Sequence, residues 1–140
     1  MIDRSRLRSI LSEAGRIALD MWPGAGRQVN SWHKSPGNPV CDADVAVDAF
    51  LKRELGALLP AAGWLSEETV DHPARLEGDL VWLVDPIDGT RDFLRGRPGW
   101  AVSVALLRSG RPLLGLLEAP ARRESWEAEA GAGAVCNGEA

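Results

Sequence analysis

Cysteine is scarce in this chain of 140 residues, and long apolar runs are absent. The two cysteines, Cys41 and Cys136, lie far apart and lack the spacing of metal ligands, so we expect free thiols in a reducing compartment. No stretch approaches the roughly 18 apolar residues that cross a membrane, and the first residues show no signal segment. These absences predict a cytoplasmic protein without a membrane partner.

Positive charge is also in short supply. Lys and Arg number 16 against 20 Asp and Glu, the net charge is −4, and no basic run occurs. Because binding to a nucleic-acid polymer requires cations placed against phosphates, we expect no such partner. With 45% hydrophobic and 26% charged residues, the composition is that of a globular domain. We therefore expect residues 1–140 to belong to a single domain.

An amphipathic helix is predicted near the start of the chain. Apolar residues recur at helical spacing from Leu7 to Met21. Asp3 or Ser5 is suited to cap its N-terminus, and the Pro-Gly-Ala-Gly segment 23–26 should end it.

A second helix is predicted after a loop. An extended piece around 29–33 leads into residues 34–40, which are rich in Pro, Gly and Asn and are predicted to form a loop. Apolar periodicity then predicts a helix over 43–59, with Asp42 as N-cap and Pro60 as its end.

The rest of the chain indicates strands. They are predicted over residues 63–66, 79–84, 100–107, 112–119 and 124–130, with Gly110 in a hairpin link. Two helices followed by strands predict an α+β fold, in which two N-terminal helices pack on a mostly antiparallel sheet. The chain stops on the turn-forming pair Asn137-Gly138, which would leave the last strands uncovered. We therefore expect the domain to lack its C-terminal part.

The segment "LVDPIDGTRDF" carries the strongest chemical signal. Phosphatases of the haloacid dehalogenase type use an aspartyl nucleophile and a second Asp two residues later, on the same face of a strand. Here Asp85 and Asp88 are three apart, with Pro86 between them. Pro86 fixes its own φ and holds Asp85 extended, so we expect the strand to end at Asp85 and the chain to turn Asp88 back toward it. This arrangement favours two carboxylates around metal ions.

The next two residues favour a phosphate. If a short helix opens at Asp88 or Gly89, its N–H groups face the same point as the carboxylates, and Gly89 permits close approach of the backbone before Thr90. Carboxylates alone would repel a phosphate dianion. Mg²⁺ between them removes this conflict, because it prefers hard oxygen ligands and can activate a water.

Two other acidic positions are candidates for the same site. Glu67, in the segment "WLSEET", follows a short apolar strand and could add a metal carboxylate, although a solvated Glu67-Glu68 pair is the plainer interpretation of that segment taken alone. Asp44 lies in the first turn of the second predicted helix, where the helix dipole alone would explain an acid.

Taken together, these motifs resemble the inositol monophosphatase family of Mg²⁺-dependent, lithium-sensitive phosphatases. The resemblance rests on "KSPGNPVCDAD", "WLSEET", "LVDPIDGTRDF", "GWAVSVAL" and "AEAGAGAVCNG", and it covers nearly the whole chain. It implies the N-terminal part of a layered αβαβα fold and direct hydrolysis of a small phosphomonoester, without a phosphoenzyme.

The resemblance also implies residue roles. The Mg²⁺ ligands would be Glu67, Asp85, Asp88 and the carbonyl oxygen of Ile87. Asp44 and the Thr90 hydroxyl would orient and deprotonate the attacking water. The phosphate would bind the backbone N–H groups of Gly89 and Thr90, and Lys34 would reach the substrate as well. The family is often dimeric, so a homodimer is an open expectation.

Three departures from the family pattern define the alternatives. Ser66 stands where Gly is frequent, which we interpret as harmless, and Cys41 stands where Thr is usual. The family's later Trp-Asp-x-Ala-Ala-Gly motif, which completes a metal site, has no match here. The alternative function is therefore a truncated, catalytically incomplete chain that at most binds metal weakly.

The substrate remains open between several classes. Inositol phosphates, 3′-phosphoadenosine nucleotides, fructose bisphosphate and histidinol phosphate are all taken by relatives of this kind. The charged pair Arg91-Asp92 before Phe93 resembles that of 3′(2′),5′-bisphosphate nucleotidases. The sequence therefore leans slightly toward a bisphosphate nucleotide.

Overall fold

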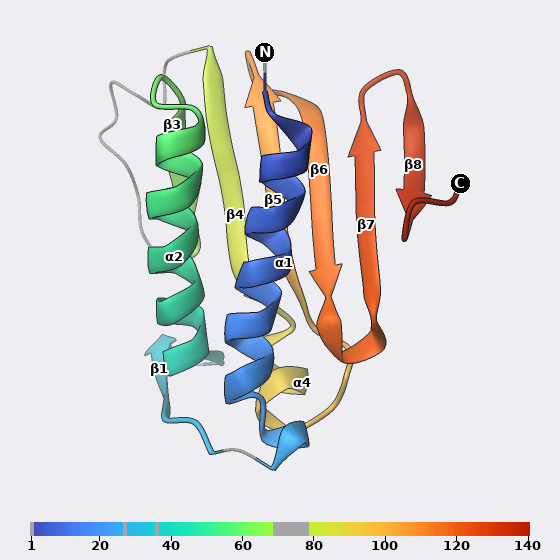
Figure 1. Ribbon diagram of the computed structural model, residues 1–140. Coiled ribbons are helices and arrows are strands. Elements are labelled where there is room, and N and C mark those ends of the chain that lie inside the picture. The colour runs from blue at the N-terminus through green and yellow to red at the C-terminus, as the bar shows by residue number, and fades with distance from the viewer. Residues whose placement is uncertain (1, 27, 36, 69–78) are drawn as a thin grey trace.

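Two helices cover one face of a six-stranded sheet, and a two-stranded ribbon leads into the second helix (Figure 1). The computed structural model describes residues 2–26, 28–35, 37–68 and 79–140. The helical segments are α1 (Arg4–Met21), η1 (Pro23–Ala25), α2 (Asp42–Leu58), α4 (Thr90–Leu94) and η2 (Pro120–Arg122). The strands are β1 (Ser31–Ser35), β2 (Asn38–Cys41), β3 (Gly63–Ser66), β4 (Leu80–Asp88), β5 (Ala101–Arg108), β6 (Arg111–Ala119), β7 (Glu124–Glu129) and β8 (Gly133–Cys136). The predicted α+β class is confirmed.

The sheet follows the order of the sequence. Its strands lie in the order β3-β4-β5-β6-β7-β8, and β1 pairs with β2 in a separate ribbon. β3 and β4 are parallel, and every later neighbour pair is antiparallel. None of the helices in the described ranges combines the length and the apolar composition that crossing a bilayer requires.

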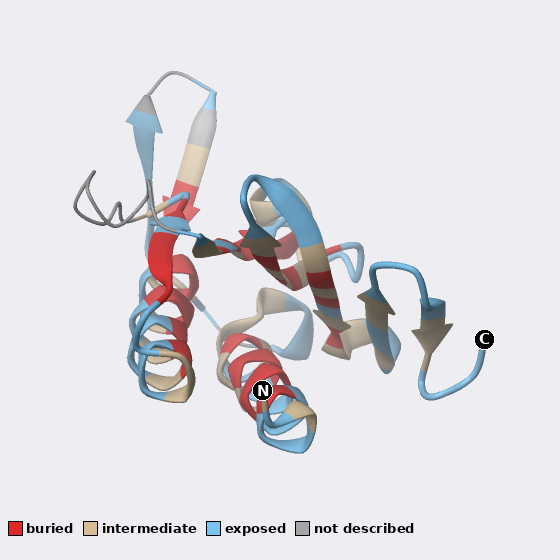
Figure 2. Cartoon of the chain, turned by 90° about the horizontal axis from the view of Figure 1, so that it is seen from above, coloured by how far each residue is buried: buried red, intermediate tan, exposed pale blue. Residues whose placement is uncertain are grey.

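The core lies between the two helices and the sheet (Figure 2). Alternation along the strands directs every second side chain of β3, β4 and β5 toward the helices. The buried strand residues on this side include Trp64, Trp82, Val84, Val102, Val104 and Leu106. Trp100 is buried as well, but Trp32 and Trp126 are 44% and 43% exposed. Those two belong to strand faces that the helices do not cover.

The opposite face of the sheet is open in the described structure. Its exposed apolar side chains are Leu65, Leu83, Leu117 and Trp126. Leu117 and Trp126 are directly opposed across β6 and β7, so they share one face.

Helix α1 forms as its periodicity predicts. The Asp3 carboxylate accepts a hydrogen bond from the Arg6 backbone N–H at 3.0 Å and caps the helix. The buried face includes Gly15, which lies against Glu118 of β6. A Cβ at Gly15 would lie 2.7 Å from Glu118 Cγ, so this helical glycine lets the helix approach the sheet.

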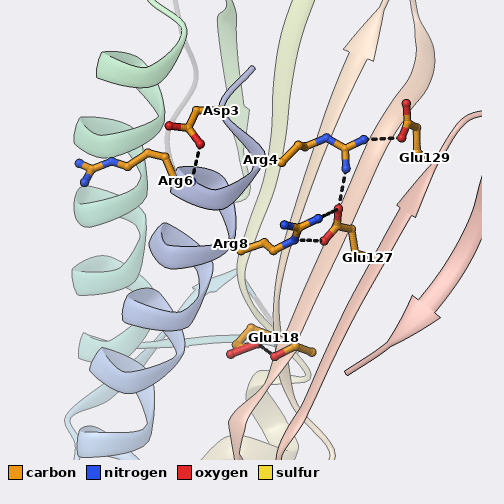
Figure 3. Close-up of polar contacts among 8 residues, drawn as sticks. Asp3, Arg4, Arg6, Arg8, Glu118, Glu127 and Glu129 are labelled. Atoms are coloured by element: carbon orange, nitrogen blue, oxygen red, sulfur yellow. Dashed lines mark hydrogen bonds and ion pairs between the residues drawn. The ribbon is translucent and has the colours of Figure 1, made fainter. Parts of the chain in front are cut away.

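Ion pairs attach the outer strands to α1. Arg4 bridges Glu127 and Glu129 of β7, and Arg8 Nε lies 2.6 Å from Glu127 Oε1 (Figure 3). The hydrogen bond from Arg8 is the first cause of a lowered pKa at Glu127. These contacts hold a strand that contributes little to the core.

Three boundaries differ from the sequence predictions. Residues 34–40 were predicted as a loop, but β2 pairs there with β1, and Pro39 is accommodated because a two-stranded ribbon does not require a donor at every residue. α2 begins at Asp42 with Cys41, in extended conformation, as N-cap, so the predicted Asp42 cap was wrong by one residue. No strand was predicted over the glycine-rich end, but β8 forms a hairpin with β7.

The close approach at Gly15 can be tested with a matched pair of helical glycines. Gly15→Ala should lower the free energy of unfolding by about 1 kcal/mol or more, because the new Cβ overpacks against Glu118. Gly56→Ala in α2 should raise it by about 0.5–1 kcal/mol, since a Cβ there meets nothing within 4 Å. Urea denaturation would measure both. Equal stabilisation by the two substitutions would contradict the contact.

Candidate functional site

The carboxyl end of β4 departs from regular strand geometry. Asp85 pairs with Ser103 and Asp88 with Ala101, so β4 carries one residue more than β5 across this step. This is a β-bulge, and it tolerates Pro86, which has no N–H to donate. The predicted end of the strand at Asp85 was therefore wrong, because β4 continues to Asp88.

A glycine turn connects the bulge to α4. Gly89 is the N-cap of α4 and has φ +90°, so the predicted helix start at Asp88 or Gly89 agrees with the structure. A Cβ at Gly89 would lie 2.9 Å from the Gly99 carbonyl oxygen. Both the backbone conformation and the lack of space therefore require glycine here. Phe93 of α4 packs edge-on against Trp100, with ring centroids 4.8 Å apart, and fixes the short helix below the turn.

The turn brings Thr90 to Asp44. The Thr90 hydroxyl oxygen lies 3.2 Å from Asp44 Oδ1 and 3.1 Å from the Ile87 carbonyl oxygen, and the hydroxyl can donate to either acceptor. Thr90 and Asp44 are 46 residues apart in the sequence. Their contact joins the end of β4 to the start of α2.

Asp44 is held from its own helix as well. Its Oδ2 accepts a hydrogen bond from the Cys41 backbone N–H at 2.8 Å, as part of a capping box at the start of α2. Burial raises the pKa of Asp44, and the hydrogen bonds from Cys41 and Thr90 oppose this rise. Burial also raises the pKa of the Cys41 thiol to about 12, so the thiol stays protonated. Both cysteines are free, as expected.

Lys34 reaches across from the ribbon to the end of β3. Its Nζ lies 3.3 Å from Glu68 Oε1 and 3.6 Å from Glu67 Oε2, and it donates to the Glu67 carbonyl oxygen at 3.4 Å. Burial lowers the pKa of Lys34, but the two glutamates outweigh it and the net shift is upward. The Glu68 side chain is 12% exposed against 61% for Glu67. Glu68 is thus the more enclosed of the pair.

These residues surround one cavity of about 260 Å³. Its lining comprises Lys34, Gly37, Pro39, Asp44, Glu67, Glu68, Asp85, Ile87, Gly89, Thr90 and Arg91. All the predicted site residues except Asp88 are among them. Asp88 is exposed and lines a neighbouring hollow with Asp92 and Arg122.

Sequence reasoning missed Glu68 as a site residue. The signal was available in the alternation of β3, because Glu68 follows the buried residues Trp64 and Ser66 at intervals of two. Alternation therefore places Glu68, and not Glu67, on the side of α2.

Asp85 experiences the summed charge of the site. Burial raises its pKa to about 7, with further increases from Asp88, Glu67, Asp44 and Glu68, in that order. The order places Asp88 electrostatically close to Asp85, even though the two line different hollows. Lys34, a cation in the cavity lining, forms ion pairs with Glu67 and Glu68.

The donor set fits a hard divalent cation. Its potential ligands are carboxylate and carbonyl oxygens, and their mutual repulsion is what a bound cation would relieve. Within the described ranges, no three Asp, Glu, His or Cys side chains already converge as a metal site.

The raised pKa of Asp85 predicts a pH-dependent stability. Between about pH 4 and pH 7 the folded chain keeps a proton that the unfolded chain releases, so the unfolding free energy contributed by Asp85 falls as pH rises. In chelator, Asp85→Asn should therefore gain stability relative to the parent between pH 4.5 and pH 8, by about 1–2 kcal/mol because solvent screens this partly exposed group. Urea denaturation across this range measures the difference. Asp20→Asn, on the exposed side of α1, is the control, and a flat difference for both variants would contradict the electrostatics.

Comparison with known proteins covers nearly the whole chain. The model of the inositol monophosphatase family matches residues 5–140. The chain is 36% identical to a histidinol-phosphatase of Chlorobaculum parvum over 92% of its own length and 48% of that protein. It is 33% identical to a fructose-1,6-bisphosphatase/inositol-1-monophosphatase of Thermotoga maritima, over 93% and 48% of the two chains.

A solved structure shares the fold. The extragenic suppressor protein suhB of Bartonella henselae matches with a TM-score of 0.88 and 29% identity, over 97% of this chain and 52% of that one. The chain spans about half the length of the curated relatives it matches. The family match, the relatives and the shared fold agree, and the chain belongs to the inositol monophosphatase family.

Proposed function

We propose that this chain serves the Mg²⁺-dependent hydrolysis of a small phosphomonoester. The observation that carries the proposal is the contact of the Thr90 hydroxyl with Asp44 beside the acidic end of β4. Asp85, Asp88, Glu67 and the Ile87 carbonyl oxygen would hold the metal. Bound Mg²⁺ would supply positive charge that lowers the pKa of a water and stabilises the leaving oxygen.

The protein's own residues would position the water and move its proton. Thr90 Oγ1 would accept a hydrogen bond from the attacking water when its own hydrogen is donated to Asp44 Oδ1, one of its two acceptors. Asp44 is the terminal proton acceptor, and a carboxylate whose pKa is raised by burial is a stronger base. The Cys41 N–H fixes the other carboxylate oxygen, so the acceptor oxygen keeps its direction.

The phosphate would dock at the glycine turn. Gly89 and Thr90 line the cavity, and the glycine leaves the backbone N–H groups open to close approach. Lys34 would contribute charge to the substrate once Glu67 turns to the metal. The alternative remains a chain that binds the metal but does not turn over, because its relatives are about twice as long.

Phosphate release tests the proposal directly. The purified chain with inositol 1-phosphate or adenosine 3′,5′-bisphosphate should release phosphate only when Mg²⁺ is present. Asp85→Asn should lose the Mg²⁺-dependent release, because it removes a metal ligand. Asp44→Asn or Thr90→Val should lower kcat about 10²-fold or more, because each removes a step of the proton path. Asp20→Asn should match the parent. Mg²⁺ binding that is lost in Asp85→Asn, without release by the parent, would instead support the alternative function.

Arg91 supports a substrate with a second anionic group. Its guanidinium lines the cavity and donates to the Gly37 carbonyl oxygen, a neutral partner. Because the guanidinium lies in the cavity wall, it would contact an anionic group of a ligand bound there. We infer that a bisphosphate is preferred, in line with the resemblance of the Arg91-Asp92 pair to bisphosphate nucleotidases.

Substitution of Arg91 separates the substrate classes. Arg91→Gln should lower kcat/KM about tenfold for adenosine 3′,5′-bisphosphate and fructose 1,6-bisphosphate, but by less than twofold for inositol 1-phosphate and histidinol phosphate. Arg95→Gln, an exposed change at the other end of α4, should leave every substrate unaffected. An equal loss of kcat/KM for all four substrates would mean that Arg91 acts only through its hydrogen bond to Gly37, in the turn of the β1–β2 ribbon.

A further inference from the structure

Two buried polar residues beside the cavity have no part in the proposed chemistry. Asp48 is 4% exposed and Ser66 is 6% exposed. Asp48 lies on the inward face of α2, among the apolar residues Val47 and Leu51. A carboxylate in such a position is unfavourable unless hydrogen bonds satisfy it, so its partners indicate what it does.

Ser66 connects Asp48 to the segment that follows β3. The Ser66 hydroxyl donates to Asp48 Oδ1, and its oxygen accepts the Glu68 backbone N–H at 3.2 Å. On the other side, the Glu67 backbone N–H donates to the Val84 carbonyl oxygen at 3.3 Å. The backbone that carries both glutamates is thus held from α2 through Ser66 and from β4 directly.

The anchor point on α2 is one turn away from Asp44. Residues four apart on a helix lie on the same face, separated by about 6 Å along the axis. The same rigid turn therefore fixes Asp44 and, through Asp48 and Ser66, the position of Glu67. Neither glutamate carboxylate takes part in this link, so it is retained when Glu67 turns from Lys34 to a metal.

We infer that Ser66 and Asp48 are positioning residues, which hold Glu67 at the distance from Asp44 and Asp85 that metal binding requires. The inference rests on the proposed function, because it concerns how a proposed Mg²⁺ ligand is held. It revises the interpretation of Ser66 as a harmless replacement of glycine. Partners that orient a ligand in this way typically change metal affinity when they are removed.

Mg²⁺ titration of the chain tests the inference with a readout besides activity. In isothermal titration calorimetry, Ser66→Ala should bind Mg²⁺ about tenfold more weakly than the parent. Phosphate release should require about tenfold more Mg²⁺, with the rate at saturating Mg²⁺ within about twofold of the parent. Ser66→Thr keeps the hydroxyl and should restore the parent affinity. Hydrogen exchange at the Glu68 amide should accelerate in Ser66→Ala and not in Ser66→Thr.

The control is a second serine–carboxylate hydrogen bond in the same chain. Ser125 donates to Glu118, and neither residue lines the cavity. Ser125→Ala should leave Mg²⁺ affinity unchanged, which separates positioning from a general loss of stability. Parent-like Mg²⁺ affinity in Ser66→Ala would overturn the inference alone. A parent chain that takes up no Mg²⁺ would overturn the proposed function, and the inference with it.

Discussion

The candidate site depends on a group of carboxylates around the end of β4 whose negative charge the surrounding side chains do not neutralise. Asp85 is partly buried, and four other carboxylates act on it, while Lys34 is engaged by Glu67 and Glu68. Carboxylates this close favour either a shared proton or a bound cation. Folding alone does not benefit from such an arrangement, and a locally unfavourable feature of this kind is expected where function requires it.

The geometry around this charge is set by rigid elements. The bulge at Pro86 and the glycine turn place Thr90, while the first turn of α2 places Asp44. Because helix α2 and the end of strand β4 hold the two partners, their 3.2 Å contact needs little rearrangement when a ligand arrives. The position of Lys34 differs, since it lies on β1, in the two-stranded ribbon that is separate from the sheet.

Local patterns predicted a large part of this molecule. Apolar periodicity predicted α1, and Asp3 was one of the two residues proposed to cap it. The motif of the β4–α4 segment predicted that Asp85, Gly89 and Thr90 share one site, and all three line one cavity. What escaped prediction depends on partners distant in the sequence. The continuation of β4 through Pro86 depends on the register of β5, and β8 depends on β7. The N-cap of α2 is Cys41 and not Asp42, because the Cys41 backbone N–H donates a hydrogen bond to the Asp44 carboxylate.

The attachment of β7 to α1 by arginine–glutamate pairs has a kinetic consequence. β7 and β8 contribute no residue to the core cluster, so ladder hydrogen bonds and salt-screened ion pairs are what hold them. The β7–β8 hairpin therefore opens locally at a lower free-energy cost than global unfolding. Its opening becomes more frequent as ionic strength rises, because salt weakens the ion pairs. Thr90, Asp44 and Asp85 lie on other elements, so these excursions leave the site intact. Local opening of the β7–β8 hairpin is therefore independent of the geometry of the candidate site.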